Sequence, residues 1–255
     1  MLRALRRAVG PGAGDASAIL IRGLIVSLMS YATSKGARQA ERIIDAAYRC
    51  LATYGYSGIS MQRIADIAGV NKRLLHYYFE TREQLIDEVA RRVGDRILAQ
   101  VEEAIGGLED PTEMVEVGFG RLWGSVRSDP ELQSVFFGLA AESVTNASLK
   151  RTLVDVNDAY RSSIHRVVRR LSRRGYRLRM DEGSMTTLII AAFQGLTLQF
   201  LEQGQTPTLD RAISDFKGWL ATIALPPGSD DDAQCRGSGP PAPRLASSWN
   251  HDDDR

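Results

Sequence analysis

The sequence predicts an all-α fold with an N-terminal three-helix unit and a larger helical domain after it. Three observations support this prediction. Apolar residues recur at helical spacing from residue 37 to residue 225. The breaks between these runs fall at Gly, Pro or helix-capping residues. Within the same range, no run shows the alternating, β-branched pattern of a strand.

The composition is that of a folded, water-soluble protein. The chain has 255 residues, 44% hydrophobic and 25% charged, which is enough for one or two domains with a real core. Its two cysteines, Cys50 and Cys235, do not form a disulfide framework, so we expect a cytoplasmic protein. Because the net charge is only +1, any surface that binds nucleic acid must be local.

Both ends of the chain differ from the periodic region. Residues 1–35 have a basic start and a short apolar run that Arg22 interrupts, and we interpret them as a disordered extension rather than a targeting segment or a membrane span. Met29 would also make a natural start, so whether 1–28 belong to the protein stays open. Residues 226–255 are rich in Pro, Gly, Ser and Asp and are predicted to be a disordered acidic tail.

The capping residues place the first helices. A helix over 37–54 ends at Gly55, a second over 61–68 begins after Ser60, and a third over about 72–80 begins after Asn71. Thr81 then caps a helix that runs to about Gly106. Further helices are predicted at 111–127, 130–145, 148–174, 182–203 and 208–224. The predicted domains are therefore 37–97 and 98–225.

Residues 60–79 have the pattern of a helix-turn-helix. Two helices that cross steeply need a small residue at their contact, here Ala65, and a residue that accepts positive φ in the turn, here Gly69. Apolar residues at Ile64, Ala68, Val70, Leu75 and Tyr78 would form the buried side. Agreement of all these positions is more specific than any one of them.

The opposite face of the helix at 72–79 is basic. Lys72 and Arg73 can reach base edges in the major groove, and the hydroxyl of Tyr77 can donate to a phosphate. Simple exposure of Lys72, Arg73 and His76, and packing of the Tyr77 ring, remain alternatives. Tyr78 and Phe79 are predicted to lie in the core. The predicted DNA contacts are Ser60, Asn71, Lys72, Arg73, Leu74, His76, Tyr77, Thr81 and Arg82.

The segment GISMQRIADIAGVNKRLLHYYFETREQLIDEV resembles the DNA-binding domain of the TetR family of bacterial transcriptional repressors. The matching residues are Ser60, Ile64-Ala65, Ala68-Gly69-Val70, Tyr77-Tyr78-Phe79 and Arg82-Glu83-Gln84-Leu85. Arg73 stands where the family often has Gly, and His76 where it often has Tyr. These departures affect base preference, so the operator sequence cannot be read from the resemblance.

The resemblance implies a homodimer that binds a palindromic double-stranded operator and is released by a small molecule. Residues 182–224 resemble the dimerising helices of the family, with Gly195 and neighbouring alanines allowing close approach. Packing within one chain is the alternative for their apolar residues. The predicted dimer residues are Phe193, Leu196, Phe200, Phe216 and Trp219.

Residues 111–174 are expected to line a pocket for a hydrophobic ligand. The aromatic candidates are Phe119, Trp123, Phe136 and Phe137, and the candidate polar anchors are Asn157, Tyr160 and His165. An ordinary core position is the alternative for each of them. An arginine stripe from Arg166 to Arg177 is interpreted as a solvated helix face, with an acidic partner as the alternative.

Two other functions compete with a ligand-responsive regulator. One is an architectural DNA-binding protein without an effector, which would have a solid core in its second domain. The other is a helical enzyme. The sequence contains no phosphate loop, nucleophile elbow or metal-ligand spacing, so we predict no enzyme activity, no cofactor and no metal.

Overall fold

A computed structural model gives the fold and describes residues 15–225, with side chains described from residue 36 to 224. The first half contains α2 (Asp15–Gly58), α3 (Met61–Ala68), α4 (Lys72–Tyr78) and α5 (Arg82–Ile105). The second half contains α6 (Pro111–Glu113), the π-helical turn η1 (Met114–Gly118), α7 (Phe119–Ser128), α8 (Pro130–Ser143), α9 (Ala147–Arg173), α10 (Glu182–Gln203) and α11 (Pro207–Thr222). The predicted all-α fold class is confirmed.

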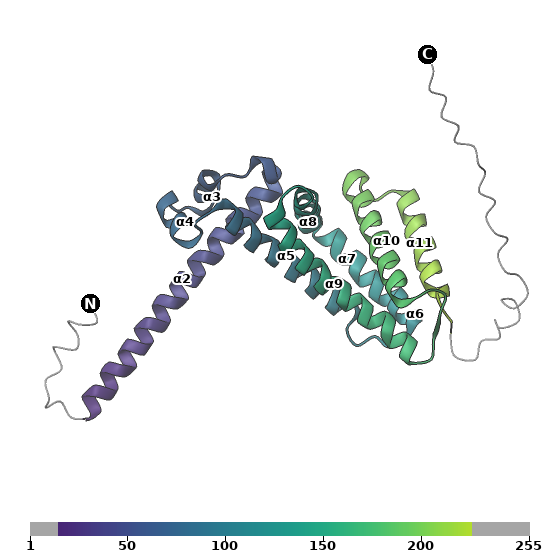
Figure 1. The fold of residues 1–255 in the computed structure, drawn as a ribbon, viewed down its shortest axis with the longest axis horizontal. Coiled ribbons are helices and arrows are strands. Elements are labelled where there is room, and N and C mark those ends of the chain that lie inside the picture. Colours follow the sequence, from purple (N-terminus) through teal and green to yellow (C-terminus); the bar gives the residue numbers. More distant parts are fainter. Residues whose placement is uncertain (1–14, 226–255) are drawn as a thin grey trace, which may run out of the picture.

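Helix α2 begins earlier than predicted. We expected its start near residue 37 and disorder before it, but the helix runs from Asp15, and its first part projects away from the other elements (Figure 1). Pro11 precedes that point, and the helix continues through Gly23 and Gly36 to Gly55, where φ is 65°. The predictions for 1–14 and 226–255 lie outside the described residues.

The core joins the first half of the chain to the second. Ile64 of α3 and Leu75 of α4 are buried in one hydrophobic cluster with Leu85 of α5, Leu132 of α8 and Leu149 of α9. Helix α5 belongs to both halves, because it follows the helix-turn-helix and then runs beside α9 (Figure 1). The predicted domain boundary at 97/98 therefore falls inside one continuous helix.

Two very short strands lie at the far end of the molecule from α4 (Figure 1). β1 (Arg177–Leu178) pairs antiparallel with β2 (Ala224–Leu225), which ties the chain after α9 to the chain after α11. The sequence shows no strand pattern at either position, and the all-α fold class is unaffected by this pair. A two-residue strand is too short to produce an alternating pattern, so it cannot be predicted from hydrophobic periodicity.

The arginine stripe of α9 pairs partly within the chain. Arg166 forms an ion pair with Glu102 at 2.8 Å, and Arg174 forms one with Glu109 at 2.7 Å. Arg170 donates to the carbonyl of Leu108 at 3.4 Å. These contacts join α9 to the end of α5 and the loop after it.

One helix in the described range, α10, is long and apolar enough to cross a membrane by length and composition alone. Only 17% of its most apolar window is buried within the chain. Some of its other residues are half-buried against the same chain, and others, such as Leu188 and Leu198, are exposed.

Candidate nucleic-acid interface

The turn between α3 and α4 is held by backbone hydrogen bonds. Gly69 has φ 64° and ψ 37°, the left-handed conformation that glycine adopts most readily. Its N–H donates to the carbonyl of Asp66 at 3.2 Å, and the next N–H, of Val70, donates back to Ala65 at 3.0 Å. The predicted helix-turn-helix geometry is present, with Ala65 fully buried where the helices meet.

One side of α4 anchors it to the core. Leu75 and Phe79 are buried, and Tyr78 is half-buried against the same cluster. The hydroxyl of Tyr78 lies near Gly36 of α2. These contacts agree with the core positions predicted for Tyr78 and Phe79.

The opposite side of α4 is open to solvent. Lys72, Arg73 and His76 are exposed, Leu74 is half-buried, and Tyr77 is 79% exposed with its ring edge-to-face on Tyr78. The side chains of Lys72 and Arg73 have no partner among the described residues. Both are in the first turn of α4, where a cation opposes the helix dipole. Helix stability therefore does not explain their presence.

His76 is oriented by the backbone. Its Nδ1 lies 3.2 Å from the carbonyl oxygen of Glu80, and a carbonyl can only accept, so Nδ1 carries the proton. Its Nε2 has no hydrogen-bond partner among the described residues, and the side chain is exposed.

Three predicted contact residues are helix caps in the structure. Ser60 accepts from the N–H of Arg63 at 3.2 Å, Asn71 from Leu74 at 2.8 Å and Thr81 from Gln84 at 3.1 Å. Each uses an oxygen as acceptor, so the hydroxyl protons of Ser60 and Thr81 and the amide N–H₂ of Asn71 remain as donors. Donors at helix starts suit phosphate oxygens.

Arg82 differs from the prediction. We expected it to bind phosphate, but its guanidinium donates to the carbonyls of Tyr56 at 2.7 Å and Ile59 at 3.3 Å. It also lies over the Tyr56 ring, 4.3 Å from the centroid. Arg82 therefore holds the end of α2 against the start of α5.

Two further arginines brace the motif and were not predicted. Arg42 of α2 donates to the carbonyl of Ala68 at 3.1 Å, at the end of α3. Arg63 of α3 donates to the carbonyl of Gly58 and lies 4.5 Å from the Tyr54 ring centroid. Their partners are backbone carbonyls or distant side chains, which leave no local signal in the sequence.

Two family models match the chain. Residues 43–89 match the model described as "Bacterial regulatory proteins, tetR family", and residues 123–225 match "BetI-type transcriptional repressor, C-terminal". Together they cover more than half of the chain, including the whole helix-turn-helix. The chain belongs to the TetR family of transcriptional regulators. Members of this family are transcriptional regulators and not enzymes.

Curated TetR relatives are distant. An uncharacterized HTH-type regulator of Mycobacterium tuberculosis is 31% identical over 38% of this chain and 48% of its own length. The regulator BetI of Agrobacterium fabrum is 28% identical over 56% of this chain and 69% of its own. The repressor AcnR of Corynebacterium efficiens is 28% identical over 42% and 61%. The chain spans about half the length of the first curated relatives it matches.

Solved TetR structures have the same fold. A regulator from Haloarcula marismortui aligns with a TM-score of 0.64 at 18% identity, covering 74% of this chain and 100% of that one. A regulator from Saccharomonospora viridis, solved in complex with choline, aligns with a TM-score of 0.61 at 20% identity, covering 74% and 99%. At such identities the likeness shows the fold alone.

The residues predicted for the TetR dimer interface have contacts within the chain. Phe193, Leu196, Phe200 and Phe216 pack against a cluster around Phe119 and Trp123 of α7. Trp219 packs against a neighbouring cluster of Val168, Met185 and Ile223. All five stay partly exposed, so their place in a dimer interface remains a prediction. Helical spacing identifies an apolar face but does not say whether its partner is the same chain or another.

Five of the seven residues predicted for the ligand pocket line one of two neighbouring cavities. Phe119 lines a largely apolar cavity of about 120 Å³. Phe136, Phe137 and Asn157 line the neighbouring cavity, and Tyr160 lines both.

Trp123 lines neither cavity, because its ring packs between Phe193 at 6.2 Å and Phe200 at 5.8 Å. His165 also lies outside both. Its Nδ1 is 3.2 Å from the hydroxyl of Thr186, and its Nε2 is 3.7 Å from Glu182.

Proposed function

We propose that this TetR-family regulator is a homodimeric repressor that binds a palindromic operator and is released by a small, largely apolar ligand. The observation that carries the DNA-binding half is the exposed basic face of α4, with Lys72 and Arg73 unpaired at a helix start. Such a face fits the major groove, where Arg and Lys bind guanine. The similar protein AcnR is a transcriptional repressor, which supports a repressor role for this protein.

The outward surface of α10 supports the homodimer. Leu188 and Leu198 are 47% and 41% exposed, and Ala191 and Gly195 lie on the same stripe. A side chain at Gly195 would meet nothing within 4 Å. An apolar stripe with small residues at its centre suits close packing against the same helix of a second subunit, and a dimer reads two half-sites about one turn (~34 Å) apart.

The cavity of about 120 Å³ supports the ligand. It lies between α5, α6, η1, α7, α9, α10 and α11, and its lining is apolar apart from Tyr160. An architectural DNA-binding protein has no need of such a space. A regulator with the same fold was solved in complex with choline, which supports binding of a small molecule by this protein.

Selection from a random DNA pool with the full chain tests this function. The expected winner is a palindrome with two half-sites about one helical turn apart. Failure to enrich any sequence, or enrichment of an asymmetric one bound by a monomer, would overturn the proposal.

Arg73→Ala then tests the groove assignment on the selected duplex. It should weaken binding by about 1–3 kcal/mol and relax preference at one base position of each half-site. Arg169→Ala, which removes an exposed arginine of α9, is the matched control and should leave the affinity unchanged.

A further inference from the structure

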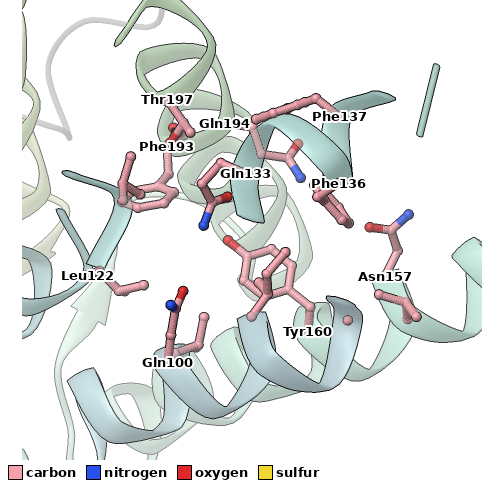
Figure 2. Close-up of a pocket in the computed structure, with 15 residues that line it drawn as sticks. Gln100, Leu122, Gln133, Phe136, Phe137, Asn157, Tyr160, Phe193, Gln194 and Thr197 are labelled. Atoms are coloured by element: carbon pink, nitrogen blue, oxygen red, sulfur yellow. Dashed lines mark hydrogen bonds between the residues drawn. The ribbon is translucent and has the colours of Figure 1, made fainter. Parts of the chain in front are cut away.

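A partly open cavity between α5, α7, α8, α9 and α10 is lined by amide groups as well as apolar side chains. Its volume is about 30 Å³. Gln100 of α5, Gln133 of α8 and Tyr160 of α9 point toward the same space (Figure 2). Three polar groups from three helices converge there.

Gln133 is the most informative of the three. Gln133 is only 7% exposed, and its side-chain amide forms no hydrogen bond with any described residue. Gln100 and Tyr160 are half-buried and likewise have no hydrogen-bond partner in the described part of the chain. A buried polar group nearly always has a partner, so Gln133 needs water or a ligand. The cavity has room for about two water molecules.

The apolar cavity adjoins this amide cavity. Leu122, Tyr160 and Phe193 line both. The larger cavity is otherwise lined by apolar side chains, among them Val168, Met185 and Ile223. It is therefore suited to hydrocarbon, and the amide cavity to a hydrogen-bonding group.

No charged side chain lines either cavity. A ligand that brought a charge would lose its hydration there without gaining an opposite charge. Tyr160 does not supply one, because burial raises its pKa to about 12, and the hydroxyl stays a neutral donor at physiological pH. The chemistry of the lining therefore selects an uncharged molecule.

We propose that the two cavities together bind one neutral amphiphile. Its apolar body fills the larger cavity, and its uncharged head group carries both a hydrogen-bond donor and an acceptor, as a primary amide or lactam does. The head group pairs with the carboxamide of Gln133 and receives further hydrogen bonds from Gln100 and Tyr160. This inference rests on the proposed function and names the chemical class of its ligand.

Calorimetry with the full chain and four probes of similar length tests the class. The probes are octanamide, 2-nonanone, octanoate and octyltrimethylammonium, measured at pH 7. Octanamide should bind at least about tenfold more tightly than each of the others, which corresponds to one additional hydrogen-bonding group. Equal or tighter binding of either ionic probe overturns the proposal, and so does the absence of binding by all four.

Gln133→Leu tests the head-group contact. It should weaken octanamide binding about tenfold and leave 2-nonanone within about threefold. It should also raise the melting temperature of the free protein, because an unpaired buried amide is removed. Gln62→Leu changes a glutamine of α3 far from the cavities and should alter none of these values.

Gln100→Leu and Tyr160→Phe test the other two proposed head-group contacts. Each should weaken octanamide binding more than 2-nonanone binding. If all three variants bind octanamide as the parent does, the amide cavity holds water only and the proposal is overturned. If Gln133→Leu melts well below the parent, Gln133 has a structural partner, which also overturns it. Because binding is measured without DNA, palindrome selection that succeeds while octanamide fails rejects the ligand class and leaves the proposed function intact.

Discussion

Lys72 and Arg82 are both cations in the first turn of a helix, yet their surroundings are opposite. Lys72 is exposed and has no partner among the described residues. Arg82 is held by two backbone carbonyls and by the ring of Tyr56. A cation of the first kind is available to DNA, whereas one of the second kind is already used to hold the fold together.

Alanine variants of these two residues should therefore behave differently. Lys72→Ala should weaken binding to all DNA sequences. It should also reduce the slope of log affinity against log salt concentration by the amount that corresponds to about one phosphate contact. Arg82→Ala should leave that slope unchanged and lower the free energy of unfolding by about 1–2 kcal/mol, since it loses two hydrogen bonds and a cation–π contact. Affinities over a salt series and urea unfolding measure both effects. A reduced slope for Arg82→Ala would restore its predicted phosphate contact.

The sequence predicts caps better than it predicts braces. Ser60, Asn71 and Thr81 act within three residues of themselves, so their roles are visible in the local pattern. Arg82 acts on carbonyls 23 and 26 residues away, and every residue type offers the same carbonyl. No spacing rule can show such a contact before the fold is known.

Tyr160 makes stability depend on pH in the alkaline range. Its pKa is about 12 in the folded protein, above its ordinary value near 10. The neutral form is favoured by folding, so its contribution is full below pH 10 and is lost as the pH rises toward 12. Tyr160→Phe should therefore lose less unfolding free energy between pH 10 and 12 than the parent, by up to about 2 kcal/mol. Parallel urea titrations at several pH values measure the difference, and identical pH profiles would contradict it.

At the scale of elements, the close contact between α5 and α9 depends on Gly94. A Cβ at this position would lie 2.5 Å from one methyl group of Val156 and 2.6 Å from the other. The two helices can approach this closely only because α5 has no side chain there. The same contact lies at the edge of the amide cavity, which both residues line.

Gly94→Ala should destabilise the protein despite the better helix propensity of alanine. Overpacking of this kind costs about 1–3 kcal/mol, compared with a propensity gain of about 1 kcal/mol. Val156→Ala in the same chain should recover much of the loss, because it removes the methyl groups that clash. Urea unfolding of the two single variants and the double variant gives the interaction energy. Simple additivity of the two effects would show that the helices do not meet at this point.

Helix positions were predictable where a cap or breaker marks the end. The predicted ranges 61–68 and 182–203 agree with α3 and α10, which end at Gly69 and Gly204. The start of α2 at Asp15 was not predictable in this way, because the composition of residues 1–35 does not mark a helix boundary. The single helix predicted at 111–127 is divided in the structure by the π-helical turn η1, which has no distinct periodicity over five residues.

At the scale of the whole molecule, the faces of α10 decide what is core and what is interface. The sequence shows an apolar helix nearly all round, and the most apolar side chains were assigned to the dimer. The structure places Phe193, Leu196 and Phe200 against α7, and leaves Leu188 and Leu198 outside. Aromatic size selected the inner face, since large rings fill the space between three helices of one chain. The outer face is marked by smaller residues, which a size criterion overlooks.

Charge placed on these two faces should have different consequences. Leu188→Arg with Leu198→Arg should convert dimers into folded monomers, because two like charges from each subunit would meet across a closely packed stripe. Loss of two leucines that the proposed dimer would bury should weaken dimerisation by about 2 kcal/mol or more, roughly thirtyfold. Phe193→Arg should instead unfold the chain, since it buries an unpaired charge between α7 and α10.

Sedimentation velocity and circular dichroism distinguish these outcomes. Val154→Arg is the matched control, because Val154 is an exposed apolar residue of α9 outside the proposed interface, and this variant should stay dimeric. The monomeric variant should still bind a single half-site weakly, because its α4 face is unchanged, but it should lose the steep preference for a palindrome. Persistent dimers after both leucines are replaced would move the interface away from α10, while a folded Phe193→Arg monomer would return it to the inner face.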